Sequence, residues 1–275
     1  MKKLIHVSIL LVFVLSAFPL KAQNVDLQRY WDDVDFSDTT LVASQTMSDK
    51  LVSFFYTFTD GDEHYFDSLS IAGLGVVLNK AKVNMRMYEY ILDFALNGYS
   101  SMGRDKVTDY LLNYPQLVEG EIAIEEGLRL DSITEPYQKV RVGAKAPELS
   151  GLAIDGKAYS LYGSKAKQVI VAFWSTDCEY CHDFLVHIRK NLDLKSDFEL
   201  VTIALADSQD EVLQAVKKMR LPGYHFYDAL RWESKPFLDY HVTSTPLVLV
   251  LDAERTIVCK PYDWDELKEW LKNNK

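Results

Sequence analysis

Two cysteines with two residues between them occur in the 275-residue chain, as Cys178-Glu179-Tyr180-Cys181. On a helix, side chains three positions apart lie on one face, so the two sulfurs can reach each other. A thiolate at a helix N-terminus is stabilised by unpaired N–H groups and by the helix dipole, which lowers its pKa below the usual ~8.5. The pair therefore predicts dithiol exchange in which Cys178 attacks and Cys181 resolves the mixed disulfide.

The elements around the pair would place it at such a helix start. The apolar, β-branched run from Gln168 to Trp174 predicts a buried strand, and a helical pattern opens at Cys178. The dipeptide Asp155-Gly156 predicts a β-hairpin with a type I′ turn. After Cys178 strands alternate with helices, which predicts an α/β fold with a mixed central sheet flanked by helices. The expected strands are 198–206, 224–227, 245–252 and 256–260, and the expected helices are 178–194, 210–219, 233–240 and 263–271.

The first half of the chain has a different pattern. From Asn24 to about Thr134 apolar residues recur at three- and four-residue spacing, which predicts a separate all-α domain. Its many aromatic residues are expected to form the core, with a partner-binding groove as the alternative. They include Tyr30, Trp31, Phe36, Phe54, Phe55, Tyr56 and Tyr65. The predicted division is a signal peptide at 1–22, a helical bundle domain at 23–134, a linker at 135–147 and the α/β domain at 148–275.

The N-terminal residues have the pattern of an export signal. Lys2 and Lys3 precede an apolar core from Ile9 to Val14, and cleavage is expected after Ala22. The chain is then exported to the periplasm or another extracytoplasmic compartment, with an N-terminal membrane anchor as the alternative if the signal stays uncleaved. The formal net charge of −10 argues against nucleic acid as a partner.

The third cysteine, Cys259, is expected to be a buried small hydrophobe in a strand rather than a redox centre. Other chemistries of the pair are weaker. Cys178 to His182 also spells a c-type haem attachment site with His182 as axial ligand, although the strand leading into the motif argues against haem. A structural zinc site lacks a second ligand pair at suitable spacing. Peroxidase chemistry is disfavoured because the proline that precedes the cysteine in the peroxidase pattern is missing from this sequence.

Four segments of the second half of the chain form a recognisable combination: 142–147, 155–157, 173–181 and 242–246. With these segments, the chain from about Val140 onward resembles a thioredoxin-fold redoxin of the TlpA-like thiol-disulfide oxidoreductase family. This resemblance implies that Pro246 is a cis-proline facing the cysteine pair, that Thr245 presents its backbone to a client, and that Trp174 packs beside the pair. The helical half resembles uncharacterised domains that precede redoxins in exported bacterial proteins.

Three positions depart from that family's pattern. Asp177 stands where a second tryptophan is usual, Ala172 replaces a buried acid, and Phe184 replaces a glutamate. Proton transfer must then use other groups, and Asp177, Glu179 and His182 are the candidates. Because nearby anions raise a thiol's pKa, we expect a reduction potential nearer ~−270 mV than ~−120 mV.

These features predict an exported thiol-disulfide oxidoreductase on the reducing side. Its partners would be client protein thiols or disulfides and a membrane or periplasmic electron donor, and the helical domain is a candidate site for a protein partner. The Cys178–Cys181 disulfide would be the redox centre, with neither a metal nor an organic cofactor. The alternative from another class is a non-catalytic binding protein whose helical domain recognises a partner and whose dithiol is vestigial.

Overall fold

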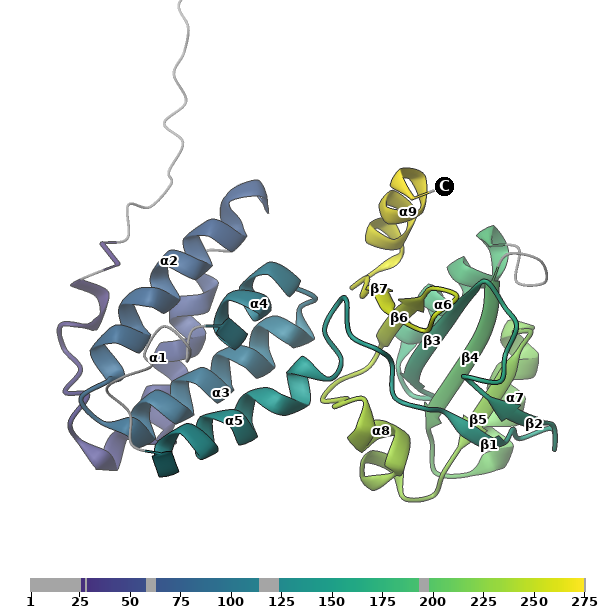
Figure 1. Cartoon of the computed structure of the whole chain (residues 1–275), viewed down its shortest axis with the longest axis horizontal. Coiled ribbons are helices and arrows are strands. Elements are labelled where there is room, and N and C mark those ends of the chain that lie inside the picture. Colours follow the sequence, from purple (N-terminus) through teal and green to yellow (C-terminus); the bar gives the residue numbers. More distant parts are fainter. Residues whose placement is uncertain (1–25, 28, 58–62, 114–123, 193–197, 275) are drawn as a thin grey trace, which may run out of the picture.

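The structure is a computed structural model, and it describes residues 26–27, 29–57, 63–113, 124–192 and 198–274 (Figure 1). The expected signal peptide at 1–22 lies outside these residues. Within the described part of the chain, no helix has both the length and the apolar character needed to cross a bilayer. Helices fill the N-terminal part, and a sheet flanked by helices fills the C-terminal part, as the sequence predicts.

The N-terminal part, here called the helical region, packs its helices around one apolar core. Ser44 and Asn84 begin two of these helices by accepting hydrogen bonds from the amides of Met47 and Met87, three residues on. The helices are α1 (Gln45–Tyr56), α2 (Glu63–Ala81), α3 (Met85–Ser101), α4 (Asp105–Asn113) and α5 (Ile124–Gln138), preceded by the short 3-10 helices η1 (Arg29–Trp31) and η2 (Thr39–Leu41).

Most of the expected core aromatics are buried in this region. Trp31 and Phe54 pack edge to face with their ring centroids 4.9 Å apart, and both are almost fully buried. Three of the expected core residues are not fully buried: Tyr30 is half-buried, Tyr56 is 67% exposed and Tyr65 is 60% exposed. Tyr56 is the last residue of α1.

Helix α5 extends into the segment expected to be linker. It runs to Gln138 and includes Pro136, whereas the sequence predicts that the helix ends by residue 134. Proline costs one hydrogen bond near a helix end. The helix tolerates this loss because Thr134 and Tyr137 are 3% and 4% exposed, so burial of this last turn holds the helical conformation. Residues 135–138 are therefore helical, and the division of the chain into domains stays a prediction.

The C-terminal part contains a five-stranded mixed sheet in the order β5-β4-β3-β6-β7. Strands β3, β4 and β5 are parallel, and β6 is antiparallel to both β3 and β7. The strands are β3 (Gln168–Ser175), β4 (Phe198–Leu205), β5 (Tyr224–Tyr227), β6 (Leu247–Leu251) and β7 (Ile257–Cys259).

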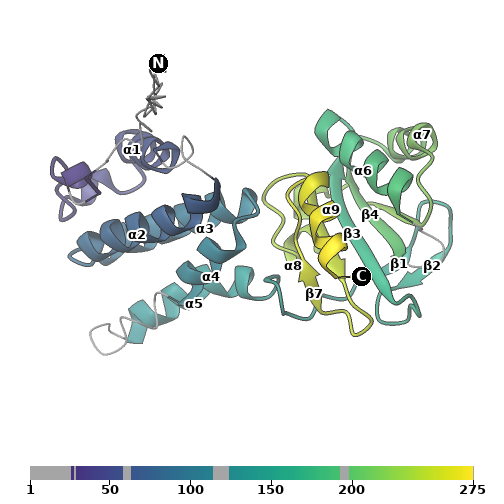
Figure 2. The ribbon, with the colours of Figure 1, turned by 90° about the horizontal axis from the view of Figure 1, so that it is seen from above.

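Both faces of the sheet are covered, which explains the continuous apolar run in β3. Side chains of Ile170, Ala172 and Trp174 face a core that includes helix residues such as Phe184. Val169 and Phe173 face the opposite core. Helices α6 (Glu179–Asn191), α7 (Gln209–Met219) and α9 (Trp264–Asn273) contribute to the first core, and α8 (Lys235–Asp239) contributes to the second, after the 3-10 helix η4 (Arg231–Glu233). Figure 2 shows α6 and α9 on one side of the sheet.

The expected hairpin is present, but its turn is not type I′. Strands β1 (Ser150–Leu152) and β2 (Ala158–Ser160) pair antiparallel across a five-residue connection. A type I′ turn needs positive φ at two central residues, and in this connection only Gly156 has one, at +81°. The Gly156 amide donates to the Ala153 carbonyl, so Ile154 and Asp155 form the turn and glycine follows it.

Candidate redox site

The two cysteines form a disulfide at the start of α6. Cys178 is the N-cap residue of this helix, and its Sγ accepts a hydrogen bond of 3.1 Å from the Cys181 amide. Cys178 is half-buried, whereas Cys181 is fully buried. The strand β3 ends at Ser175, three residues before Cys178, so Cys178 lies just beyond the end of this central strand. Of the two sulfurs, that of Cys178 is open to a partner.

The loop before β6 faces the disulfide from the other side. The Thr245–Pro246 peptide bond is cis, as the sequence predicts, and the Thr245 carbonyl oxygen lies 4.0 Å from Cys178 Sγ. Within the described residues, the Thr245 amide donates no hydrogen bond. The backbone beside Cys178 therefore has a donor available to an incoming chain.

Trp174 lies beneath the pair rather than on the surface. It is fully buried in β3, and its ring meets the His182 ring edge to face with centroids 5.5 Å apart. Neither Trp174 Nε1 nor His182 Nε2 has a hydrogen-bond partner within the described part of the chain. His182 follows Cys181 directly and is half-buried.

The two acidic candidates for proton transfer flank Cys178 on the surface. Asp177 and Glu179 are both exposed, and among the described residues neither carboxylate has a hydrogen-bond or ion-pair partner. The Asp177 amide donates to Ser175 Oγ at 3.3 Å, which shapes the loop before the helix. The geometry brings Cys178, Cys181 and Thr245 together with the buried Trp174, and a relay through Asp177, Glu179 or His182 stays a prediction.

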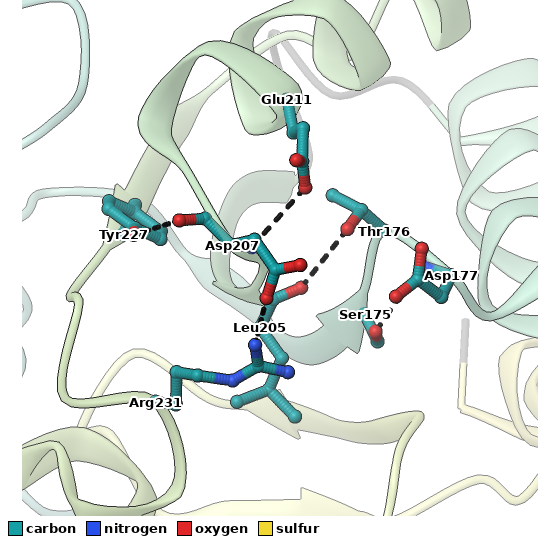
Figure 3. A network of polar contacts seen from close by, with 8 residues as sticks. All are labelled: Ser175, Thr176, Asp177, Leu205, Asp207, Glu211, Tyr227 and Arg231. Carbon is teal, nitrogen blue, oxygen red and sulfur yellow. Dashed lines mark hydrogen bonds and ion pairs between the residues drawn. The ribbon is translucent and has the colours of Figure 1, made fainter.

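A polar network joins the loop that carries Cys178 to the ends of the neighbouring strands (Figure 3). The Thr176 amide donates to the Leu205 carbonyl at 3.0 Å, which ties the loop after β3 to the end of β4. Asp207, two residues beyond, forms an ion pair with Arg231. Its amide donates to Glu211 at 3.3 Å, and its carbonyl accepts from the Tyr227 hydroxyl at 3.2 Å.

The sequence analysis does not identify this network. A signal existed, because the carboxyl ends of parallel strands meet at one edge of a sheet. Asp207 follows β4 and Tyr227 ends β5, so their proximity to the loop after β3 follows from the strand order. Arg231 carries no such signal, since its position depends on a left-handed backbone with φ +54°.

Cys259 differs from the Cys178–Cys181 pair in bonding and in reactivity. It lies in β7, is half-buried and carries a free thiol. Burial raises the pKa of this thiol to about 12, and the nearby carboxylates of Asp105 and Glu266 add to the effect. A thiol with so high a pKa is almost wholly protonated at neutral pH and is a poor nucleophile.

A cavity of about 870 Å³ lies away from the dithiol. It opens beside Lys167 and Phe198, where β3 and β4 begin, at the opposite end of the sheet from Cys178. Among the described residues, no group of three or more His, Cys, Asp and Glu side chains is arranged to hold a metal ion. The site thus places the half-buried Cys178 beside a Thr245 amide that has no hydrogen-bond partner among the described residues, a geometry suited to a polypeptide.

A mixed sheet with a disulfide at the N-terminus of the helix that follows its central strand, and a cis-proline opposite, defines a thioredoxin-like fold. Residues 142–260, somewhat less than half of the chain, match the AhpC/TSA family. The C-terminal half therefore contains an AhpC/TSA-type redoxin domain. No curated protein matches the sequence.

The chain is similar to several solved structures, and the match with a TM-score above 0.5 shows the same fold. A thioredoxin-like protein from Bacteroides caccae is 18% identical, with 90% of this chain and 91% of that chain covered and a TM-score of 0.58. The thioredoxin domain of a thiol-disulfide oxidoreductase from Bacteroides vulgatus is 21% identical over 48% of this chain and 96% of that chain, with a TM-score of 0.44. A thiol:disulfide interchange protein from Bacteroides sp. is 20% identical over 50% and 91%, with a TM-score of 0.43.

Proposed function

We propose that this protein is a thiol-disulfide oxidoreductase that exchanges disulfides with client proteins through Cys178 and Cys181. The observation that carries the proposal is the half-exposed sulfur of Cys178 at the start of α6, 4.0 Å from the Thr245 carbonyl oxygen. The AhpC/TSA match and the names of the Bacteroides relatives support the same chemistry.

In the reducing direction, the Cys178 thiolate attacks a client disulfide. A new bond forms between Cys178 Sγ and one client sulfur, and the other client sulfur leaves as a thiolate that takes up a proton. Cys181 then loses its proton and attacks Cys178 Sγ, which releases the second client sulfur and forms the Cys178–Cys181 disulfide. Two electrons pass from the pair to the client, and an external donor must restore the dithiol.

The different burial of the two cysteines assigns the attacking role to Cys178 and the resolving role to Cys181. Cys181 is fully buried, so it reaches Cys178 and no client. Its amide already donates to Cys178 Sγ at 3.1 Å, and the same N–H can stabilise the thiolate after reduction. The Thr245 amide offers a hydrogen bond to the client backbone, and the disulfide is the redox centre without a metal or an organic cofactor.

The same proposal assigns the protein to the reducing side. Exposed carboxylates at Asp177 and Glu179 flank Cys178 and oppose thiolate formation. We expect a reduction potential nearer ~−270 mV than ~−120 mV. Equilibration with glutathione redox buffers measures this potential, and a strongly oxidising value would refute the direction while leaving the exchange chemistry intact.

Export and its consequences belong to the proposal as well. The signal pattern at residues 1–22 supports a periplasmic or extracytoplasmic protein that receives electrons from a membrane or periplasmic donor. Mass spectrometry of the mature protein should find Gln23 at the N-terminus. A full-length protein in the membrane fraction would instead support the uncleaved anchor.

Insulin reduction driven by dithiothreitol tests the activity. The wild type and Cys259→Ser should accelerate it alike, and Cys178→Ser should be as slow as the uncatalysed reaction. Equal inertness of the wild type and Cys178→Ser would favour the alternative, a binding protein with a vestigial dithiol.

A further inference from the structure

The last residues of α3 and the turn that leads into α4, residues 100–104 and here called the α3–α4 turn, lie against the loop that carries the cis-proline. Ser101 Oγ is 3.3 Å from Thr243 Oγ1, although the two residues belong to different parts of the chain. Thr243 precedes Thr245 by two residues, which span at most about 7 Å of backbone. The helical region therefore reaches the immediate surroundings of the point where a client would meet Cys178.

The same turn also lies close to the first turn of α6, with one residue in between. Gly103 has φ +66°, and a Cβ at this position would come within 2.9 Å of Tyr262 Cβ. The Tyr262 ring lies beside the Tyr180 ring at a centroid distance of 6.2 Å. Tyr180 lies between Cys178 and Cys181 in the first turn of α6, and both tyrosines are 47% exposed. The α3–α4 turn therefore contacts the loop that carries the cis-proline and, through Tyr262, approaches the start of the helix that carries the dithiol.

An ion pair next to the turn joins the two parts of the chain. Asp105 begins α4, and its Oδ1 lies 4.0 Å from Nζ of Lys260. The Lys260 side chain is only 6% exposed, whereas that of Asp105 is 33% exposed. Burial raises the pKa of Asp105 to about 6, an effect that Lys260 partly opposes. The buried Lys260 ammonium and the half-buried Asp105 carboxyl group thus place this edge of the helical region next to the C-terminal part.

The space between the turn and the cis-proline loop is too small for a client. A cavity of about 30 Å³ lies there, with Ser101, Thr243 and Pro246 in its lining. That volume accommodates about one water molecule. A client chain therefore cannot pass between the two parts and must lie along the outer side of the turn.

We propose that the α3–α4 turn is part of the client-binding surface and that the client it fits is an extended polypeptide segment. The inference rests on the proposed function. A segment with its cysteine at Cys178 and its backbone beside Thr245 reaches Ser101 about two residues from that cysteine. The residues beyond the immediate neighbours of the client cysteine then contact the helical region, and they contribute to binding.

Two peptides that differ only in length test this surface in the full chain. Each carries one cysteine in a mixed disulfide with a chromophoric thiol, and the short one has a single residue on either side, whereas the long one has four. The short peptide cannot reach Ser101. For the wild type we expect kcat/KM to be about tenfold higher for the long peptide, mainly through KM.

Ser101→Tyr adds bulk on the half-buried turn, and Gly103→Val forces the turn away from Tyr262. Both should bring the long-to-short ratio near one and leave kcat/KM for the short peptide and the reduction potential unchanged. Gly143→Val is the matched control, because Gly143 has φ +91° but no atom within 4 Å of an added Cβ. This variant should keep the wild-type ratio.

A ratio near one in the wild type, or an equal loss in Gly143→Val and the turn variants, would overturn the inference while the exchange activity stands. A wild-type ratio that both turn variants retain would overturn it as well. If neither peptide is reduced by the wild type, the proposed function fails and the inference fails with it.

Discussion

Cys178 Sγ and the carbonyl oxygen of Thr245 are 4.0 Å apart, although 67 residues separate them in the sequence. The contact exists because β3 and β6 are neighbours in the sheet, with Phe173 paired to Leu247. The helix start that follows one strand and the loop that precedes the other therefore meet at the same edge. A client sulfur bonded to Cys178 would bring its own backbone beside Thr245.

Alkylation should distinguish the three thiols of the reduced protein. At pH 7 we expect iodoacetamide to modify Cys178 at least about tenfold faster than Cys181 or Cys259. Cys181 is fully buried, and burial raises the pKa of Cys259 to about 12. Peptide mapping by mass spectrometry over a time course gives the three rates. Modification of Cys259 as fast as that of Cys178 would contradict this assignment.

Neutralising the acids beside Cys178 should make the protein more oxidising. In Asp177→Asn and Glu179→Gln, loss of a negative charge favours the thiolate, which lowers the Cys178 pKa and stabilises the reduced form. The pH dependence of iodoacetamide reaction should move to lower pH, by up to about one unit in the double variant. The matched control is Asp183→Asn, an exposed acid one turn further along α6. A shift in the control as large as in the double variant would exclude a local effect.

His225 should make the stability of the C-terminal part sensitive to mild acid. Its side chain is buried, with Nδ1 2.9 Å from Thr202 Oγ1 and Nε2 3.3 Å from the Leu221 carbonyl oxygen. Burial lowers the pKa of His225, so the folded state favours the neutral ring. The contribution of this group is full above pH 6.5 and is lost as the pH falls below that value toward the lowered pKa.

Urea unfolding at several pH values checks this dependence. Between pH 7.5 and pH 5 the wild type should lose more stability than His225→Gln. His187→Gln, which changes an exposed histidine on α6, should follow the wild type. Parallel pH profiles of the wild type and His225→Gln would rule out this role.

Arg255 should be irreplaceable even by lysine. It is 3% exposed, has φ +62°, and directs its guanidinium at backbone carbonyls rather than at a carboxylate. Lysine is a compact cation and cannot reproduce the planar fork, so Arg255→Lys should cost about 2–4 kcal/mol of unfolding free energy. The acceptors are the carbonyl oxygens of Leu161, Ser164, Ala166, Asp252 and Ala253.

Arg220→Lys is the control for that substitution. Arg220 has nearly the same backbone conformation, with φ +55°, but its side chain is exposed at the end of α7. Its replacement should change the unfolding free energy by less than about 0.5 kcal/mol. Equal effects of the two substitutions would show that the carbonyl contacts of Arg255 contribute nothing.

Local patterns in the sequence predict much of the C-terminal fold. The apolar run in β3 and the cysteines at the start of α6 are identifiable because strand burial and helix capping act over a few residues. The cis bond before Pro246 is what the family resemblance implies, since most X-Pro bonds are trans and local chemistry alone does not predict it. The end of α5 was predicted wrongly, since the burial of Tyr137 outweighs the local effect of Pro136. The turn at Gly156 depends on a backbone detail that the dipeptide alone does not decide.

The remaining features of the site depend on contacts between distant segments. The Asp207–Arg231 pair joins the end of β4 to η4, and the contact of Ser101 with Thr243 joins two parts of the chain. None of these four residues is of an unusual type for its position, so composition and periodicity do not predict either contact. Such contacts become visible only when the strand order and the packing of the two parts are known.

The central claim is that Cys178 forms the mixed disulfide with a client and that Cys181 resolves it. Incubation of Cys181→Ser with an excess of a disulfide-linked peptide, followed by mass spectrometry of the digested adduct, tests it most directly. The account predicts one peptide per chain, attached to Cys178, and no stable adduct in the wild type. An adduct on Cys259, or none on Cys178, would contradict it.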